Sequence, residues 1–230
     1  MIIKNDELST VDLWKKNAPP MGGDKQWKDG RSAKELANYM TSSFPNMPAE
    51  LEEILSDIID KNSILKLGAE YVTDFSSEGF GRGEGRNHDG ILFNDDIFIG
   101  IEAKADESLG RLISDELESA SDNKKLRIDK LVNLLFNDGA ENHKNLRYQL
   151  LTASAGVLLE AKNRKCKKAL LAIIVFKKSG CYSPAKIQEN ERDIYRFLIE
   201  TQAIPKNGYW QINTNTGKEL LFCKIDIEVN

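Results

Sequence analysis

An unbroken run of eight apolar residues at positions 169–176 is the feature that most restricts the folds open to this chain. A strand of this composition has no polar face to present to water, so it must be covered on both sides. Helical patterns able to supply that cover occur at 33–43, 49–61, 109–119, 126–136, 146–163 and 184–202. The sequence therefore predicts an α/β fold with a central mixed β-sheet flanked by helices.

A second apolar strand, expected at 97–105, ends with two charged side chains, Glu102 and Lys104. Residues two apart on a strand share a face, so these two side chains are expected to lie together. Ionised groups are almost never left unpaired in an apolar interior, because their desolvation is costly. The pattern indicates a site at which these charges meet a partner.

A hairpin is expected to bring Asp89 to the same place. Residues 87–94 read as the preceding strand, and a short polar break separates it from the next one. If Asn94 pairs with Ile97, counting back puts Asp89 directly opposite Glu102, with Cβ atoms roughly 5 Å apart. Other even loop lengths keep both carboxylates on one face, whereas an odd loop without a bulge would separate them.

Two facing carboxylates and a lysine point to a divalent cation. Mg²⁺, or Mn²⁺ in its place, usually takes one or two carboxylates, waters and substrate oxygens. Asp89 and Glu102 would then bind the metal, and Lys104 would orient a water or a phosphate. Such a set suits the hydrolysis of phosphodiester bonds. The alternative is a lysine–carboxylate cluster at a strand end close to solvent.

The rest of the chain supplies the frame of the sheet. Residues 1–30 are expected to form a loosely structured lead-in that Trp14 and Trp27 pin to the rest of the protein. The glycine-rich stretch 76–86 lacks the ending of a phosphate-binding P-loop and reads as a flap, with Arg82 and Arg86 available for phosphates. Further strands are expected at 64–75, 209–213 and 219–228.

Composition narrows the class of protein. The chain has 230 residues, 40% hydrophobic and 30% charged, which suits a single globular domain. A net charge of −4 argues against a general DNA-coating role. The three cysteines are expected to be free thiols in a cytoplasmic protein, and no stretch is long and apolar enough for a membrane span. His88 and His143 lack metal-ligand spacing and are expected to be structural.

Asp89 followed by Glu102-x-Lys104 at the end of the next strand resembles the PD-(D/E)xK nuclease superfamily, which has a restriction-endonuclease-like fold. The motif's usual proline is replaced by His88. The superfamily's α-β-β-β-α-β core can be laid onto residues 48–176, with a helical insertion at about 107–140. The parts outside this core would be an N-terminal extension with a helix at 1–47 and a C-terminal helix and hairpin at 177–230. Residues 27–33 and 146–151 look like an uncharacterised bacterial family of this type.

The resemblance implies roles for further residues. It makes the Ala103 backbone carbonyl the third protein ligand of the metal and Gln149 a polar helper beside it. It also suggests Glu50 as another acidic ligand, with Glu53 as a substitute. The plainer interpretations are a surface glutamine at position 149 and a glutamate that complements the helix dipole at position 50.

Arg147 has two open interpretations. It could contact a phosphate of the substrate, or it could form an ion pair between two helices. The restriction-like fold also leaves a homodimer open, although no residue marks an interface.

The sequence thus predicts a Mg²⁺-dependent endonuclease or exonuclease acting on DNA, in defence or repair. One alternative is a catalytically inactive nuclease fold that serves as a binding or assembly module. A third is a metal-dependent hydrolase of another phosphoester.

Overall fold

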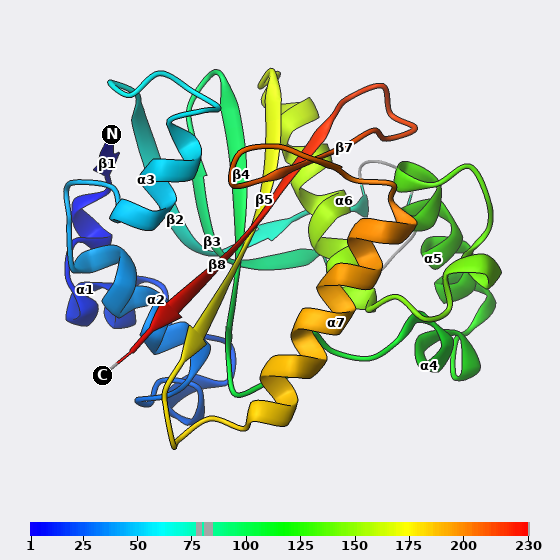
Figure 1. The fold of residues 1–230 in the computed structure, drawn as a ribbon, viewed down its shortest axis with the longest axis horizontal. Coiled ribbons are helices and arrows are strands. Elements are labelled where there is room, and N and C mark those ends of the chain that lie inside the picture. Colours follow the sequence, from blue (N-terminus) through cyan, green and yellow to red (C-terminus); the bar gives the residue numbers. More distant parts are fainter. Residues whose placement is uncertain (77–79, 81–84, 230) are drawn as a thin grey trace.

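The computed structural model describes residues 1–76, 80 and 85–229 and contains an eight-stranded mixed sheet with helices on both faces (Figure 1). This confirms the predicted α/β class. The strands are β1 (Ile2–Lys4), β2 (Ile64–Thr73), β3 (Arg86–Phe93), β4 (Ile97–Ala105), β5 (Lys168–Lys177), β6 (Ile204–Pro205), β7 (Trp210–Ile212) and β8 (Leu220–Glu228).

The helices occur in the segments between β1 and β2, between β4 and β5, and between β5 and β6. They are α1 (Val11–Asn17), α2 (Ser32–Thr41), α3 (Ala49–Leu55), α4 (Ile113–Glu118), α5 (Asp122–Leu135), α6 (Tyr148–Asn163) and α7 (Pro184–Glu200). Short 3₁₀ helices occur at Asp6–Leu8, Gly23–Lys25 and Ala140–His143. The expected order of helix, three strands, helix and strand is present as α3, β2, β3, β4, α6 and β5, with α4 and α5 inserted before α6.

The strand order across the sheet is β1-β2-β3-β4-β5-β8-β7-β6. β2, β3 and β4 pair antiparallel, whereas β4, β5 and β8 pair parallel at the centre. β5 is buried along almost its whole length, as the apolar run at 169–176 predicts. Central parallel strands without polar faces need helices on both sides, and the two helical layers meet that need.

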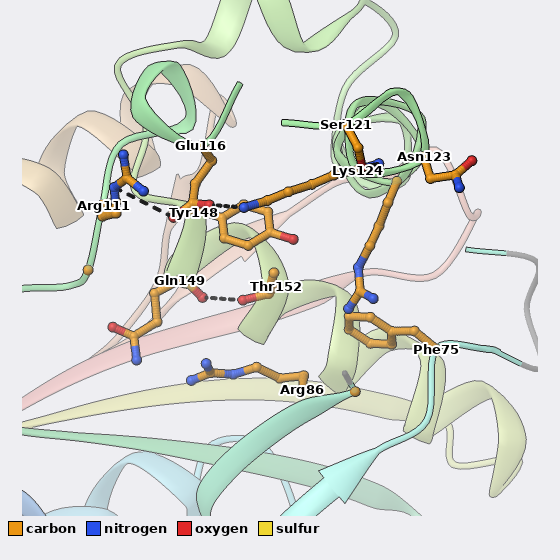
Figure 2. A pocket seen from close by; sticks show the side chains of 13 residues that line it. Phe75, Arg86, Arg111, Glu116, Ser121, Asn123, Lys124, Tyr148, Gln149 and Thr152 are labelled. Carbon is orange, nitrogen blue, oxygen red and sulfur yellow. Dashed lines mark hydrogen bonds and ion pairs between the residues drawn. The ribbon is translucent and has the colours of Figure 1, made fainter. Parts of the chain in front are cut away.

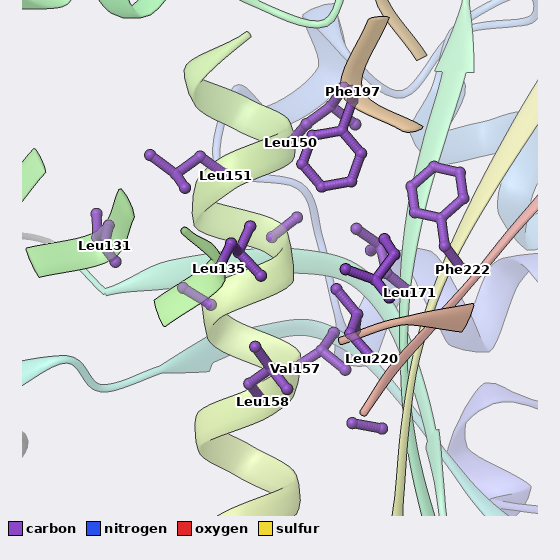
Figure 3. Packing of buried hydrophobic residues seen from close by; sticks show 14 of the residues in the cluster. Leu131, Leu135, Leu150, Leu151, Val157, Leu158, Leu171, Phe197, Leu220 and Phe222 are labelled. Carbon is purple, nitrogen blue, oxygen red and sulfur yellow. The ribbon is translucent and has the colours of Figure 1, made fainter. Parts of the chain in front are cut away.

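Two apolar clusters fill the space between the sheet and its helices. On one face, α1, α2 and α3 contribute buried side chains that include Trp14, Leu36 and Leu51. On the other face, α4 to α7 cover the sheet, and Figure 3 shows α6 and α7 side chains packed against Leu171 and Phe222 of the central strands. The core therefore lies on both sides of β4 and β5.

The turn between β3 and β4 is set by Asn94. Its side-chain oxygen accepts hydrogen bonds from the backbone N–H groups of Asp96 (2.9 Å) and Ile97 (3.0 Å). The Asn94 N–H donates to the Ile97 carbonyl at 3.1 Å, so these two residues face each other as the sequence predicts. An asparagine side chain that bonds its own turn in this way fixes the register of the hairpin.

The N-terminal segment is more ordered than the sequence analysis expects. Ile3 of β1 is fully buried and pairs parallel with β2, while Trp14 of α1 is 2% exposed. Thr10 caps α1 by accepting a hydrogen bond from the Leu13 N–H at 3.2 Å. The expectation of a loose lead-in is therefore wrong for residues 2–17, which form β1 and α1, whereas the expected pinning by Trp14 is confirmed.

The α3 helix is shorter than its sequence pattern predicts. The helix expected at 49–61 ends at Leu55, and the N–H groups of Asp57 and Ile58 bond three residues back, so the chain tightens into a turn. The glycine-rich flap falls largely outside the described residues, and so does the phosphate role of Arg82.

Glycine allows an unusually close approach of β4 to α6. A Cβ atom on Gly100 would lie 2.5 Å from Val157 Cγ2 and 2.9 Å from the ring of His88. These distances are too short for unaltered packing, and both neighbours are buried. The approach is what packs α6 tightly against the strand that carries Glu102.

We expect Gly100→Ala to lower the free energy of unfolding by about 1–3 kcal/mol, because the added methyl group overpacks the interface. Chemical denaturation measures this change. Gly90→Ala is the matched control, since its Cβ would meet its nearest neighbours at 3.4–3.5 Å, which is ordinary contact. We expect that control to stay within about 1 kcal/mol of the wild type. Equal effects of the two substitutions would contradict the packing argument.

His88 is fully buried on the α6 side of the sheet, with its Nε2 3.2 Å from the Thr73 hydroxyl. Burial, reinforced by the nearby Arg86 charge, lowers the pKa of His88 to about 3. The ring is therefore neutral in the folded protein at ordinary pH, which fits a structural role.

Because the His88 pKa is depressed in the folded state, stability should fall as the pH drops from about 6.5 towards 3. Below about pH 6.5 His88 becomes protonated in the unfolded chain but stays neutral in the folded chain. The resulting decrease in the free energy of unfolding is on the order of 4 kcal/mol. Denaturation curves of wild type and His88→Asn between pH 7 and pH 4 measure it, and the variant should show the weaker pH dependence. If the free energy of unfolding fell equally steeply with pH in both proteins, His88 would not be the group responsible.

Candidate active site

Asp89, Glu102, Lys104 and Gln149 line one cavity of about 410 Å³. Its walls come from β2, β3, β4, the start of α6 and the segment that leads into α2. The remaining lining residues are Pro20, Met21, Lys25, Gln26, Arg31, Ser32, Ala33, Glu70, Asn87 and Glu107. The residues that the hairpin argument selected are thus brought together by the fold.

Asp89 lies where the ladder between β3 and β4 ends. The paired residues run from Phe93–Phe98 to Gly90–Ile101, and Asp89 and Glu102 do not form the next pair. Instead, the Ala103 N–H donates to Asp89 Oδ2 at 2.8 Å. The expected direct opposition of Asp89 and Glu102 is therefore wrong in detail, because the Asp89 carboxylate bonds the backbone of the neighbouring strand.

Glu102 is the most enclosed acid of the cavity, with 1% of its surface exposed. Its Oε1 accepts hydrogen bonds from Lys104 Nζ (2.8 Å) and from Gln149 Nε2, and its Oε2 forms an ion pair with Arg86. Three donors from β3, β4 and α6 thus converge on one carboxylate. A buried carboxylate needs such partners, since an unpaired one costs far more than a fold can spare.

Arg86 and Lys104 carry shifted pKa values. Burial lowers the pKa of Lys104, and the Asp89 and Glu107 carboxylates oppose that shift. Burial also lowers the pKa of Arg86, again opposed by Asp89. Both cations thus interact with Asp89 as well as with Glu102, so the four groups form one electrostatic cluster.

Glu70 is a cavity residue that the sequence analysis did not select. It lies on β2 with a left-handed backbone (φ 48°), and its carboxylate accepts a hydrogen bond from Asn87 Nδ2 at 2.7 Å. Burial raises the pKa of Glu70, and the Asp89 charge adds to the increase. An acidic residue within the strand expected at 64–75 was the available signal, the same kind of signal that marked Glu102 on β4.

Two predicted site residues lie elsewhere. Glu50 does not line the cavity, and its Oε2 accepts a hydrogen bond from the Tyr39 hydroxyl at 3.3 Å. Arg147 bonds Asp193 Oδ2 (2.6 Å), and it also pairs with Glu189 of α7. The interhelical ion pair is therefore the interpretation that the structure supports for Arg147.

The two carboxylates of the cavity are a donor set that suits a hard divalent cation. Asp89 and Glu102 offer oxygen ligands in one cavity, and Mg²⁺ commonly completes its shell with water. Among the residues that the structure describes, no group of three or more histidine, cysteine, aspartate or glutamate side chains is arranged to hold a metal ion. Glu102 would also have to exchange Arg86 for the metal.

A larger cavity of about 690 Å³ adjoins the first one at Gln149, which lines both (Figure 2). Its described lining includes the basic side chains of Arg86, Arg111, Lys124 and Arg127 and the carboxylate of Glu116. The lining comes from the start of β3, from α4 and α5, and from the first turns of α6.

The protein thus has an α/β fold with a charged cavity at the end of a β-hairpin. A family profile described as "Domain of unknown function (DUF6946)" matches residues 7–228, so the chain belongs to this family. No curated protein and no solved structure matches the chain. In the described part of the chain, no helix is long and apolar enough to cross a membrane.

Proposed function

We propose that this protein is a Mg²⁺-dependent nuclease of the PD-(D/E)xK type that hydrolyses phosphodiester bonds of DNA. The observation that carries the proposal is the grouping of Asp89, Glu102 and Lys104 in one cavity at the end of the β3–β4 ladder. A cytoplasmic location and a role in defence or repair belong to the same proposal.

In this proposal Asp89, Glu102 and the Ala103 carbonyl would hold the metal, which would supply charge stabilisation and lower the pKa of a bound water. Lys104 would hold a water or a phosphate oxygen; the position of its ammonium, 2.8 Å from Glu102 and with three donors, supports this role. Gln149 bonds Glu102 and so holds the carboxylate in position from α6. In hydrolysis the oxygen of one water would form a bond to phosphorus while the bond to the leaving sugar oxygen breaks, and that oxygen would take up a proton released from the water.

Arg86 competes with a metal for Glu102. Its guanidinium already neutralises the carboxylate, so binding of a cation there must displace or turn the arginine. Arg86 also lines the basic cavity, which gives the displaced guanidinium an alternative position beside an incoming phosphate. The phosphate role expected for Arg86 therefore stays part of the proposal, now coupled to the release of Glu102.

Calorimetric titration with Mn²⁺ and Mg²⁺ tests the metal site directly. We expect one site in the wild type and a loss of affinity of about 100-fold or more in Glu102→Gln and Asp89→Asn, since each removes a charged ligand. Glu50→Gln is the matched control, because it removes a carboxylate that lies outside the cavity. A wild type without measurable binding, or variants that bind like the control, would contradict the proposal.

Removal of the competing cation should strengthen metal binding. We expect Arg86→Gln to bind Mn²⁺ about tenfold more tightly than the wild type, equivalent to about 1.4 kcal/mol. Arg31→Gln is the control, because Arg31 lines the same cavity and none of its described contacts is with Glu102. Weaker binding in Arg86→Gln than in Arg31→Gln would mean that the arginine supports the site instead of competing for it.

One observation favours a second candidate, a catalytically inactive binding or assembly module. Glu102 Oε1 accepts hydrogen bonds from Lys104 and Gln149, and Oε2 is ion-paired with Arg86, so the described cluster balances this charge without a metal. Cleavage assays on single-stranded DNA, duplex DNA, RNA and a simple phosphodiester, with Mg²⁺ and with Mn²⁺, separate the candidates. Cleavage of the simple ester alone would indicate a hydrolase of another phosphoester, whereas no cleavage and no metal binding would indicate the module.

A further inference from the structure

The cavity in Figure 2 is a cationic site that the hydrolytic chemistry does not itself require. Among the residues that the structure describes, four basic side chains line it together with one carboxylate, that of Glu116. Two of them share that acid: Lys124 Nζ pairs with Glu116 Oε2, and Arg111 Nε lies 3.9 Å from Oε1. In the described part of this wall one carboxylate serves both Lys124 and Arg111, so the wall carries an excess of positive charge that attracts anions.

The cavity also holds a buried donor without a partner. Arg86 Nε is buried and, within the described part of the chain, has no hydrogen-bond acceptor. The rim is more open, since the side chains of Arg111 and Lys124 are 57% and 38% exposed. A buried guanidinium at the floor and exposed cations at the rim form the arrangement that binds a phosphate by charge-assisted hydrogen bonds.

The position of the cavity ties it to the carboxylates. Gln149 lines both cavities, and Arg86 reaches from the basic cavity to Glu102. An anion that lies against Arg86 is therefore next to the candidate metal ligand. The opposite wall is built by α4 and α5, the two helices inserted between β4 and α6.

We propose that this basic cavity binds a backbone phosphate of a nucleic acid strand, next to the bond held at the carboxylates, and that the α4–α5 insertion serves as the strand clamp. Arg111 and Lys124 contact the phosphate from the rim, and Arg86 contacts it from the floor. The identity of the ligand as a nucleic acid strand rests on the proposed function, whereas the phosphate chemistry rests on the cavity itself.

Binding of a fluorescent 12-nucleotide DNA strand in EDTA tests the clamp without cleavage and without metal. The double variant Arg111→Gln/Lys124→Gln should bind about tenfold more weakly than the wild type at low salt. The slope of log K against log salt should shrink by about 0.7 for each phosphate that the variant no longer neutralises. The matched control is Lys61→Gln/Lys206→Gln, which removes the same charge from exposed positions that line neither cavity. Thermal unfolding checks that both double variants are folded.

A clamp variant that binds the strand like the control would overturn the proposal. Equal affinity of the cavity for inorganic phosphate and for the strand would also overturn it, because the ligand would then be a small phosphate compound. The test is separate from that of the nuclease. Asp89→Asn should keep strand binding in EDTA while losing metal, so loss of metal binding alone counts against the proposed function and loss of the clamp effect alone counts against this inference.

Discussion

The end of the β3–β4 ladder is the feature on which the site depends. At that point the Ala103 N–H, which would otherwise lose its partner, donates to the Asp89 carboxylate. A buried amide without an acceptor costs about 1–3 kcal/mol, so Asp89 has a structural task even before any chemistry is considered. Glu102, Lys104 and Glu70 line one cavity beside this interruption. A substitution that keeps one acceptor oxygen, such as Asp89→Asn, preserves this arrangement better than alanine would.

The buried charges explain why the structure supports two functional interpretations. Glu102 and Lys104 are 1% and 5% exposed, and such groups persist in an apolar interior only when other charges or hydrogen bonds satisfy them. Arg86 and Gln149 complete that set from β3 and α6. In the proposed nuclease, the arginine yields Glu102 to the metal and moves towards a phosphate in the basic cavity. In the inactive module, the same ion pair is permanent. The two interpretations therefore differ in whether a metal ion replaces Arg86 at the Glu102 carboxylate.

How well the sequence predicted the structure depended on the range of the interactions. The bounds of β4 and the facing of Asn94 and Ile97 follow from local pattern and turn chemistry, and both are as expected. Trp14 anchors the N-terminal segment as expected, whereas β1 has no sequence signal, because its parallel pairing with β2 is a contact that no local pattern reveals. Glu50 was assigned by the superfamily resemblance, and the fold places it against Tyr39 instead. Glu70 was overlooked, although an acid within a strand was a usable signal.

By itself the sequence determined that Glu102 and Lys104 share a face of a buried strand, since alternation along a strand is a property of the backbone. It also determined the hairpin that carries Asp89 to the same end of the sheet. Only the tertiary structure decided what meets those charges. Arg86, Gln149 and the α4–α5 insertion come from separate elements, and their convergence depends on how helices pack on a twisted sheet. Contacts between residues so far apart along the chain have no local signature, because they are fixed by the burial of surfaces and not by the spacing of residues.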